Sequence, residues 1–126
     1  MAHNPAFLKA VDLARKKIKE LTVDQVVERR KKPGTFHFID VREDSEWNAG
    51  FCEGAQHIGK GVIERDIETD IPDRGAEIIL YCGGGFRSAL AADSLQEMGY
   101  TNVASMDGGF RVWCSKGLPV DKGGEE

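Results

Sequence analysis

The sequence EIILYCGGGFRSA, residues 77–89, decides the fold because it joins the pattern of a buried strand to that of a helix. Residues 77–82 contain a continuous apolar run, which is typical of a central strand buried on both faces of a sheet. Residues 86–98 have the apolar spacing of a helix, and Gly99 ends it. Three glycines stand between the two, although each costs about 0.5–1 kcal/mol relative to alanine in an ordered element. The sequence therefore predicts a strand–loop–helix unit whose loop has a function beyond joining the strand to the helix.

Strands and helices alternate on both sides of this unit. The further predicted strands are FHFIDV at 36–41, a short segment near 56–58 and NVASM at 102–106. Two further helices are predicted before the strand at 36–41, one over 5–20 and one from Thr22 to about Lys32 with a Thr22–Gln25 capping box. A short helix follows that strand, capped by Asp44 or Ser45 and ended by Gly50. The last two are a helix over 63–69 and one that contains Phe110, Val112 and Trp113. This alternation predicts an α/β fold with a mostly parallel central sheet of about five strands, helices on both of its faces, and an extra N-terminal helix.

The length of 126 residues fits one domain with one core. We expect an N-terminal helical extension over 1–20, the α/β domain over 21–120, and a flexible C-terminal tail over 121–126.

Composition and charge exclude several classes of partner. The formal net charge of −4 argues against a general nucleic-acid or anionic-membrane binder. No apolar run approaches the roughly 18 residues that span a bilayer, and the N-terminus carries charges where a signal peptide is apolar. We therefore expect a cytoplasmic protein. Its three cysteines form neither an even set nor a CxxC pair, so we expect reduced thiols rather than a disulfide framework. No second histidine lies at metal-ligand spacing from His37, so we expect no metal site, and we expect no cofactor.

Cys82 stands where a ligand would bind, because sites in open α/β sheets lie beyond the carboxyl ends of the strands. The first N–H groups of the following helix have no intrahelical partner, and the helix dipole places roughly half a positive charge there. Glycines let the backbone curl around an atom without obstruction by Cβ. The loop from Cys82 to Arg87 is thus predicted to be an anion cradle that stabilises a nucleophilic thiolate.

At these residues the chain resembles the rhodanese-like domain, specifically its single-domain sulfurtransferases, over about residues 20–120. CGGGFRS at 82–88 is similar to the family's C-x-x-G-x-R-S active-site loop. IDVREDSEW at 39–47, GFCEGAQHI at 50–58 and DGGFRVWCSKGLPV at 107–120 resemble further family segments, in the same order.

The resemblance implies a sulfurtransferase that needs no cofactor. Cys82 would take a sulfane sulfur from a small anion such as thiosulfate and, as a persulfide, pass it to cyanide, a thiol or a partner protein. The residues expected to bind the substrate are Gly83, Gly84, Gly85, Phe86, Arg87 and Ser88. Arg87 would meet the donor or tie down the loop, and Ser88 would cap the helix or bond the sulfur. Asp40 and Arg42 are expected to lie near the loop and to support it as an ion pair, with direct contact with the substrate as the alternative.

The remaining singled-out residues have simpler interpretations. Cys52 and Cys114 are expected to be buried or half-buried inert thiols, and Trp47 and Trp113 to anchor the core. Phe86 and residues 60–70 are expected to form the pocket rim that reads the substrate.

Two other functions stay open. One is a phosphatase or arsenate reductase of the related cysteine-loop fold, whose loop is typically Cys-x5-Arg. Here four residues separate Cys82 from Arg87, and Tyr81 replaces the histidine that usually precedes the cysteine, so both features favour sulfur. The other is a noncatalytic binding module, although such modules usually lose the cysteine. The N-terminal helix is a candidate for docking a partner or a second copy of the chain.

Overall fold

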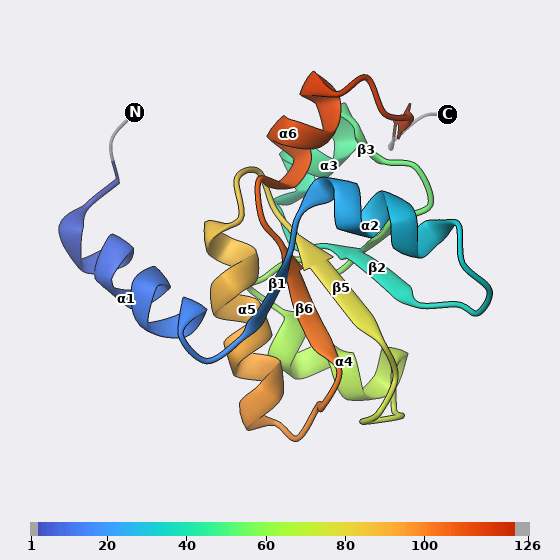
Figure 1. Ribbon diagram of the computed structural model, residues 1–126. Coiled ribbons are helices and arrows are strands. Elements are labelled where there is room, and N and C mark those ends of the chain that lie inside the picture. Colours follow the sequence, from blue (N-terminus) through green and yellow to red (C-terminus); the bar gives the residue numbers. More distant parts are fainter. Residues whose placement is uncertain (1–2, 123–126) are drawn as a thin grey trace.

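The computed structural model describes residues 3–122, and five parallel strands form its central sheet (Figure 1). The spatial order is β1-β6-β5-β2-β4. These strands are β1 (Lys19–Leu21), β2 (His37–Asp40), β4 (Gln56–His57), β5 (Ile78–Tyr81) and β6 (Val103–Met106). All pairings between neighbours are parallel. The central position of β5 confirms the interpretation of its apolar run, because all four of its residues are buried.

Helices cover both faces of this sheet, as the alternation predicts (Figure 1). They are α1 (Pro5–Arg15), α2 (Val23–Arg30), α3 (Asp44–Ala49), α4 (Ile63–Asp70), α5 (Phe86–Glu97) and α6 (Gly109–Ser115). One buried cluster joins α4 and α5 to the sheet, and a second joins α2 and α6 to the opposite face.

The two faces of β5 follow from the alternation of side chains along a strand. Ile78 and Leu80 belong to the cluster under α4 and α5, whereas Ile79 and Tyr81 belong to the cluster under α2 and α6. Cys82 continues the first series. The cysteine side chain therefore points toward α5, the helix that begins four residues later.

The first helix is shorter than the pattern predicts. It ends at Arg15, and Lys19–Leu21 form the edge strand β1 beside β6. The prediction of a helix over 5–20 was wrong at its end because three residues of β1 gain hydrogen bonds from β6, which local apolar spacing cannot indicate. Immediately after β1, the capping box of Thr22 and Gln25 is present at the start of α2.

Helix α1 lies outside α5 and packs against it (Figure 1). Val11 and Ala14 are buried in this contact, whereas Leu8 and Leu13 remain exposed. The side of α1 that carries Val11 and Ala14 is therefore already occupied by the same chain.

A second, two-stranded sheet lies apart from the first. Its strands are β3 (Phe51–Cys52) and β7 (Val120–Asp121), paired antiparallel. Asp121 is therefore held in a strand, although the sequence places it in a flexible tail. The rest of that predicted tail includes residues 123–126, which lie outside the described residues.

The short helix α3 also differs from expectation at its cap. Its N-cap is Glu43, which forms a capping box with Glu46, rather than Asp44 or Ser45. Gly50 ends the helix as predicted. Within residues 3–122, no helix has the length and apolar character that crossing a membrane requires.

Candidate active site

The sulfur of Cys82 lies in a cradle of backbone N–H groups at the carboxyl end of β5. Gly85 N–H donates to Sγ at 3.1 Å, and Ser88 N–H donates at 3.4 Å. The backbone of Gly85 has a φ of +105°, a conformation that glycine adopts without strain and that turns its N–H toward the sulfur. The N–H groups of Gly83, Gly84, Phe86 and Arg87 have no acceptor within residues 3–122, so further donors line the same loop. This arrangement can bind negative charge on sulfur.

Helix α6 holds the loop in this conformation. Its N–H groups at Phe110 and Arg111 donate to the carbonyls of Cys82 and Gly83 at 2.8 and 3.0 Å. Because these carbonyls face α6, the loop keeps its N–H groups for the sulfur side. The close approach requires Gly109, whose φ is +53°: a Cβ there would lie 2.3 Å from the carbonyl oxygen of Cys82. The sequence pattern predicts Gly109 only as the lead into a helix.

A buried pair of hydroxyls lies behind the sulfur. Ser88 Oγ is 3.5 Å from Cys82 Sγ and 2.8 Å from Ser105 Oγ on β6. Both serines are fully buried. Of the two roles considered for Ser88, the structure shows the contact with sulfur, while the helix N-cap is Gly85. Ser105 was missed because nothing in the local sequence of β6 marks its proximity to the loop.

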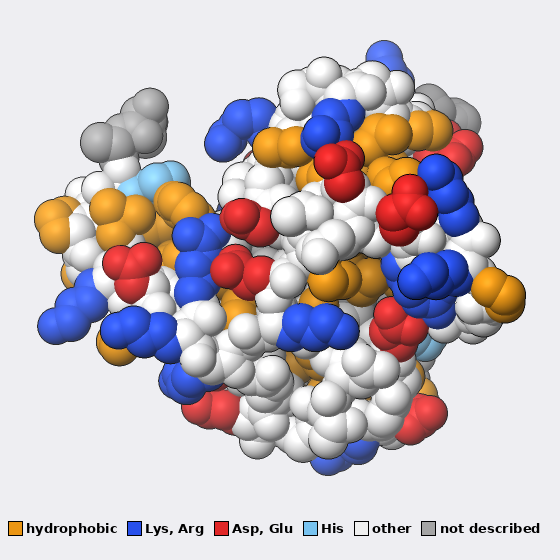
Figure 2. All heavy atoms as spheres, viewed as in Figure 1, with side chains coloured by type: hydrophobic (Ala, Val, Ile, Leu, Met, Phe, Trp, Pro, Cys, Tyr) orange, Lys and Arg blue, Asp and Glu red, His pale blue; other side chains and the backbone are white. Residues whose placement is uncertain are grey.

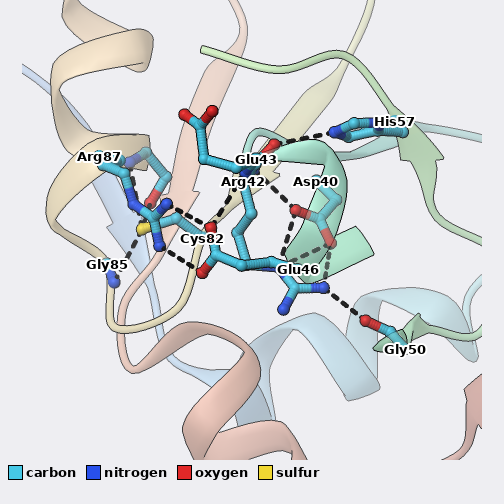
Figure 3. A network of polar contacts seen from close by, with 10 residues as sticks. Asp40, Arg42, Glu43, Glu46, Gly50, His57, Cys82, Gly85 and Arg87 are labelled. Atoms are coloured by element: carbon cyan, nitrogen blue, oxygen red, sulfur yellow. Dashed lines mark hydrogen bonds and ion pairs between the residues drawn. The ribbon is translucent and has the colours of Figure 1, made fainter. Parts of the chain in front are cut away.

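Arg87 is paired with a carboxylate on the wall of the site. Its two terminal nitrogens donate to the two carboxylate oxygens of Glu46 on α3 at 2.7 and 3.0 Å (Figure 3). The hydrogen bonds from Arg87 lower the pKa of Glu46, and Glu46 in turn raises the pKa of Arg87. This contact is consistent with a role in tying down the loop, and contact with the donor stays a prediction. Glu46 was not identified by sequence reasoning, although it lies within the quoted segment at 39–47.

The expected ion pair between Asp40 and Arg42 is present and buried (Figure 3). Arg42 donates to both oxygens of Asp40 at 2.8–3.0 Å and to the carbonyl of Gly50 at 2.6 Å. Burial alone would lower the pKa of Arg42, but the hydrogen bond and charge of Asp40 outweigh it and raise the pKa. The guanidinium also lies 4.2 Å from the ring centroid of Phe110 on α6. The pair thus connects β2, the end of α3 and the helix that holds the cysteine loop.

A cavity of about 860 Å³ opens over Cys82. Its lining includes Gly83, Gly84, Phe86, Arg87, Glu46 and Arg111, together with His3, Asn4 and Phe7 from the N-terminal segment. Figure 2 shows the surface hollowed between the N-terminal end of α1 and the end of the molecule that carries α6. Phe86 lines the cavity as predicted, but residues 60–70 do not. The N-terminal segment takes that place, and residues 1–20 carried no signal for it because they lie outside the family resemblance.

The other two cysteines differ from each other. Cys52 is fully buried, and burial raises the pKa of its thiol to about 12, which fits the expected inert thiol. Cys114 is exposed, so the expectation of a buried or half-buried thiol was wrong there, because α6 turns this residue toward solvent. Within residues 3–122, no three histidine, cysteine or acidic side chains are grouped so that they could hold a metal ion.

The two tryptophans also differ. Trp113 is buried in the core as expected, and its indole N–H donates to the carbonyl of Pro119. Trp47 is only half-buried: it stacks between Phe51 and His57, with ring centroids 3.6 and 4.9 Å away. The prediction of a core anchor was therefore wrong for Trp47, which caps the edge of the molecule near β3 and β4.

Comparison with known proteins agrees with this geometry. The thiosulfate sulfurtransferase GlpE of Haemophilus influenzae (strain KW20 Rd) is 33% identical over 103 residues, which cover 82% of this chain and 94% of the relative. The thiosulfate sulfurtransferase PspE of Escherichia coli K12 is 35% identical over 72 residues, 57% of this chain and 69% of the relative.

Among solved structures, a Rhodopseudomonas palustris protein described as a possible tyrosine phosphatase superimposes with a TM-score of 0.80. It is 26% identical, and the match covers 96% of this chain and 98% of that one. The family model of the rhodanese-like domain matches residues 22–116, a span that contains the cysteine cradle, the Asp40–Arg42 pair and the helix that holds the loop. This chain belongs to the rhodanese-like domain family.

Proposed function

We propose that this protein is a sulfurtransferase that carries a sulfane sulfur as a persulfide on Cys82. The observation that supports it most directly is the cradle itself, in which two backbone N–H groups already donate to Sγ and four more line the loop without an acceptor in the described chain. A persulfide anion is stabilised by such donors. The reaction needs no side-chain base, because a thiolate is already nucleophilic. The names of the curated relatives point to the same class of reaction.

The reaction proceeds in two displacements. The Cys82 thiolate attacks the outer sulfur of thiosulfate; the S–S bond breaks, and sulfite leaves with its electron pair. The outer sulfur of the resulting persulfide is then attacked by an acceptor such as cyanide, a thiol or a cysteine of a partner protein. The second S–S bond breaks, and its electron pair returns to Cys82 Sγ. Negative charge stays on sulfur atoms inside the cradle throughout.

The alternative of phosphate-ester chemistry is motivated by the Rhodopseudomonas palustris protein. In such chemistry an arginine holds the oxyanion, and here each terminal nitrogen of Arg87 already donates one hydrogen bond to Glu46. Only four residues separate Cys82 from Arg87, so the loop is one residue shorter than the Cys-x5-Arg loop of such enzymes. The shorter loop and the Arg87–Glu46 pair favour sulfur transfer.

Incubation with thiosulfate followed by intact-mass measurement tests the proposal. The wild-type protein should gain the mass of one sulfur atom, and Cys82→Ser should gain none, whereas Cys114→Ser should load normally because Cys114 is exposed and absent from the cavity lining. Hydrolysis of an aryl phosphate by a protein that takes up no sulfur would overturn the proposal in favour of the alternative.

A further inference from the structure

The two arginines that line the cavity differ in their partners. Arg87 is bound to Glu46, so its charge is neutralised on the wall. Arg111 is exposed, and its side chain has no hydrogen bond or ion pair with any residue of the described range 3–122. Its guanidinium lies over the glycine loop: a Cβ on Gly84 would be 3.1 Å from Nη1 and 3.3 Å from Nη2. An uncompensated positive charge therefore lies directly above the cradle.

The backbone of Arg111 is fixed by the same contact that shapes the loop. Its N–H donates to the carbonyl of Gly83 at 3.0 Å, so the start of the side chain is held beside the loop. The guanidinium at its end presents two parallel N–H donors, the geometry that suits a carboxylate.

The opposite wall of the cavity is aromatic. Phe86 of the cysteine loop packs against His3 and Phe7 of the N-terminal segment, with ring centroids 5.0 and 6.2 Å away. Arg15 lies 5.2 Å from the Phe86 centroid and bonds Asp107 at 3.0 Å, which fastens α1 beside the loop. In Figure 2, hydrophobic and histidine side chains gather at this end of α1, across the hollow from Lys or Arg side chains.

The size of the cavity fits an organic molecule. Its volume of about 860 Å³ lies within the range of about 300–1,000 Å³ that is usual for small-molecule sites. A small inorganic anion would fill little of it and would leave the aromatic wall without a partner. Aromatic rings stabilise a ligand by covering its carbon surface, which thiosulfate lacks.

We propose that the sulfur acceptor of this protein is a low-molecular-weight organic thiol that carries a carboxylate. Arg111 binds the carboxylate, the wall of His3, Phe7 and Phe86 covers the hydrocarbon part, and the thiol sulfur faces the cradle. This inference rests on the proposed function. The acceptor thiolate attacks the outer sulfur of the Cys82 persulfide, the S–S bond breaks, and its electron pair returns to Sγ. The organic persulfide leaves, and the proton lost by the thiol goes to solvent.

Separating the two half-reactions tests this assignment. The protein is loaded with excess thiosulfate, freed of small molecules and checked for one added sulfur by mass. Discharge is then timed with mercaptopropionate, mercaptoethanol and mercaptoethylamine, which are anionic, neutral and cationic. For each thiol, the discharge rate of wild type is divided by that of Arg111→Gln. The intrinsic reactivity of the thiol cancels in this ratio. Arg65→Gln is the matched control, because Arg65 is an exposed arginine on α4 outside the cavity lining.

We expect Arg111→Gln to slow discharge by mercaptopropionate about tenfold, to leave mercaptoethanol nearly unchanged and to speed mercaptoethylamine, with no selective effect of Arg65→Gln. Equal effects on all three thiols would overturn the role of Arg111. If Arg111→Gln does not load with sulfur while wild type and Arg65→Gln do, Arg111 acts in the first half-reaction. That result would also overturn its role in binding the acceptor. Loading of wild type that no small thiol discharges would instead indicate a protein acceptor. If wild type does not load at all, the proposed function itself fails.

The aromatic wall is tested by a second variant. Phe7→Ala should slow discharge by a mercapto acid that carries a phenyl group more than discharge by mercaptopropionate. Equal slowing of the two acids would show that the wall makes no contact with the acceptor.

Discussion

Gly109 is the point at which a main-chain contact sets the shape of the cysteine loop. Replacing it by alanine would place Cβ 2.3 Å from the carbonyl oxygen of Cys82, in a backbone conformation with φ of +53°. Since neither backbone can yield without breaking the bonds from α6, we expect Gly109→Ala to lower the free energy of unfolding by about 2–4 kcal/mol. Sulfur loading should fall with it. Urea unfolding and intact mass after thiosulfate measure the two effects.

Gly117 supplies the control for this substitution. Its φ is +70°, but a Cβ there would meet nothing within 4 Å. Gly117→Ala should therefore cost only the backbone strain, about 1 kcal/mol, and should leave loading intact. If both variants lost the same stability, the close approach at Gly109 would have no energetic consequence.

The Arg87–Glu46 pair predicts a dependence on pH. The pKa of Glu46 is lowered in the folded protein by the hydrogen bonds from Arg87, so its stabilising contribution is present above the pKa of the unfolded chain. That contribution is lost as the pH falls through the lowered folded value. Because the pair is about one-third exposed, we expect Glu46→Gln to cost no more than about 1 kcal/mol at neutral pH.

The difference between wild type and Glu46→Gln should therefore shrink in acid, as measured by urea unfolding at a series of pH values. A double-mutant cycle with Arg87→Gln isolates the pair from other effects of each change. A difference that grows toward low pH would contradict the assigned direction of the shift.

Local sequence was sufficient for one part of the site and insufficient for another. The strand end, the three glycines and the helix start lie within residues 77–89 and predict the cradle, because the groups that bind sulfur are consecutive. Glu46, Ser105 and Arg111 come from α3, β6 and α6, and their proximity to Cys82 depends on how those elements pack. Residues of these types also occur at many positions with no such role, so their identity alone carried no signal.

At the scale of elements, α1 contributes to the fold through one side. Val11 is 1% exposed against α5, whereas Leu13 is 50% exposed on the same helix. We expect Val11→Ala to lower the free energy of unfolding by about 1–2 kcal/mol, because it removes two buried methyl groups. Leu13→Ala should change it by less than about 0.5 kcal/mol. Urea unfolding of the two variants compares them directly, and a larger loss at Leu13 would indicate that another surface covers it.

The elements predicted best are those with strong internal patterns. The buried run of β5, the helical spacing of α5 and the capping box of α2 were all confirmed. The strands β1, β3 and β7 were missed, since each has only two or three residues and exists because of its hydrogen-bonded partner. The sheet reaches five strands only with β1, which the sequence pattern had assigned to the first helix.

At the scale of the whole molecule, Cys52 reports on global unfolding. It is fully buried and its pKa is raised to about 12, so the native protein exposes almost no Cys52 thiolate at neutral pH. In a Cys82→Ser, Cys114→Ser background, we expect alkylation of Cys52 to follow the population of the unfolded chain. Its rate should rise with urea and with destabilising changes such as Gly109→Ala.

The measurement is the rate of iodoacetamide labelling followed by mass. The matched control is the single variant Cys82→Ser, in which exposed Cys114 should be labelled rapidly without denaturant. Labelling of Cys52 in the native protein at the rate of the unfolded chain would mean that the region around β3 and β7 opens locally instead.

His3 lies on the wall of the cavity. A probe near this end of the chain could therefore report on the reaction. An environment-sensitive fluorophore attached at residue 3 would lie at the entrance of the cavity, where an arriving acceptor changes its surroundings. The fluorescence of the same dye attached at Lys122, just beyond β7 and outside the cavity lining, should not change. For the same reason, an affinity tag fused ahead of His3 would alter the measured kinetics. Purification tags therefore belong after Lys122.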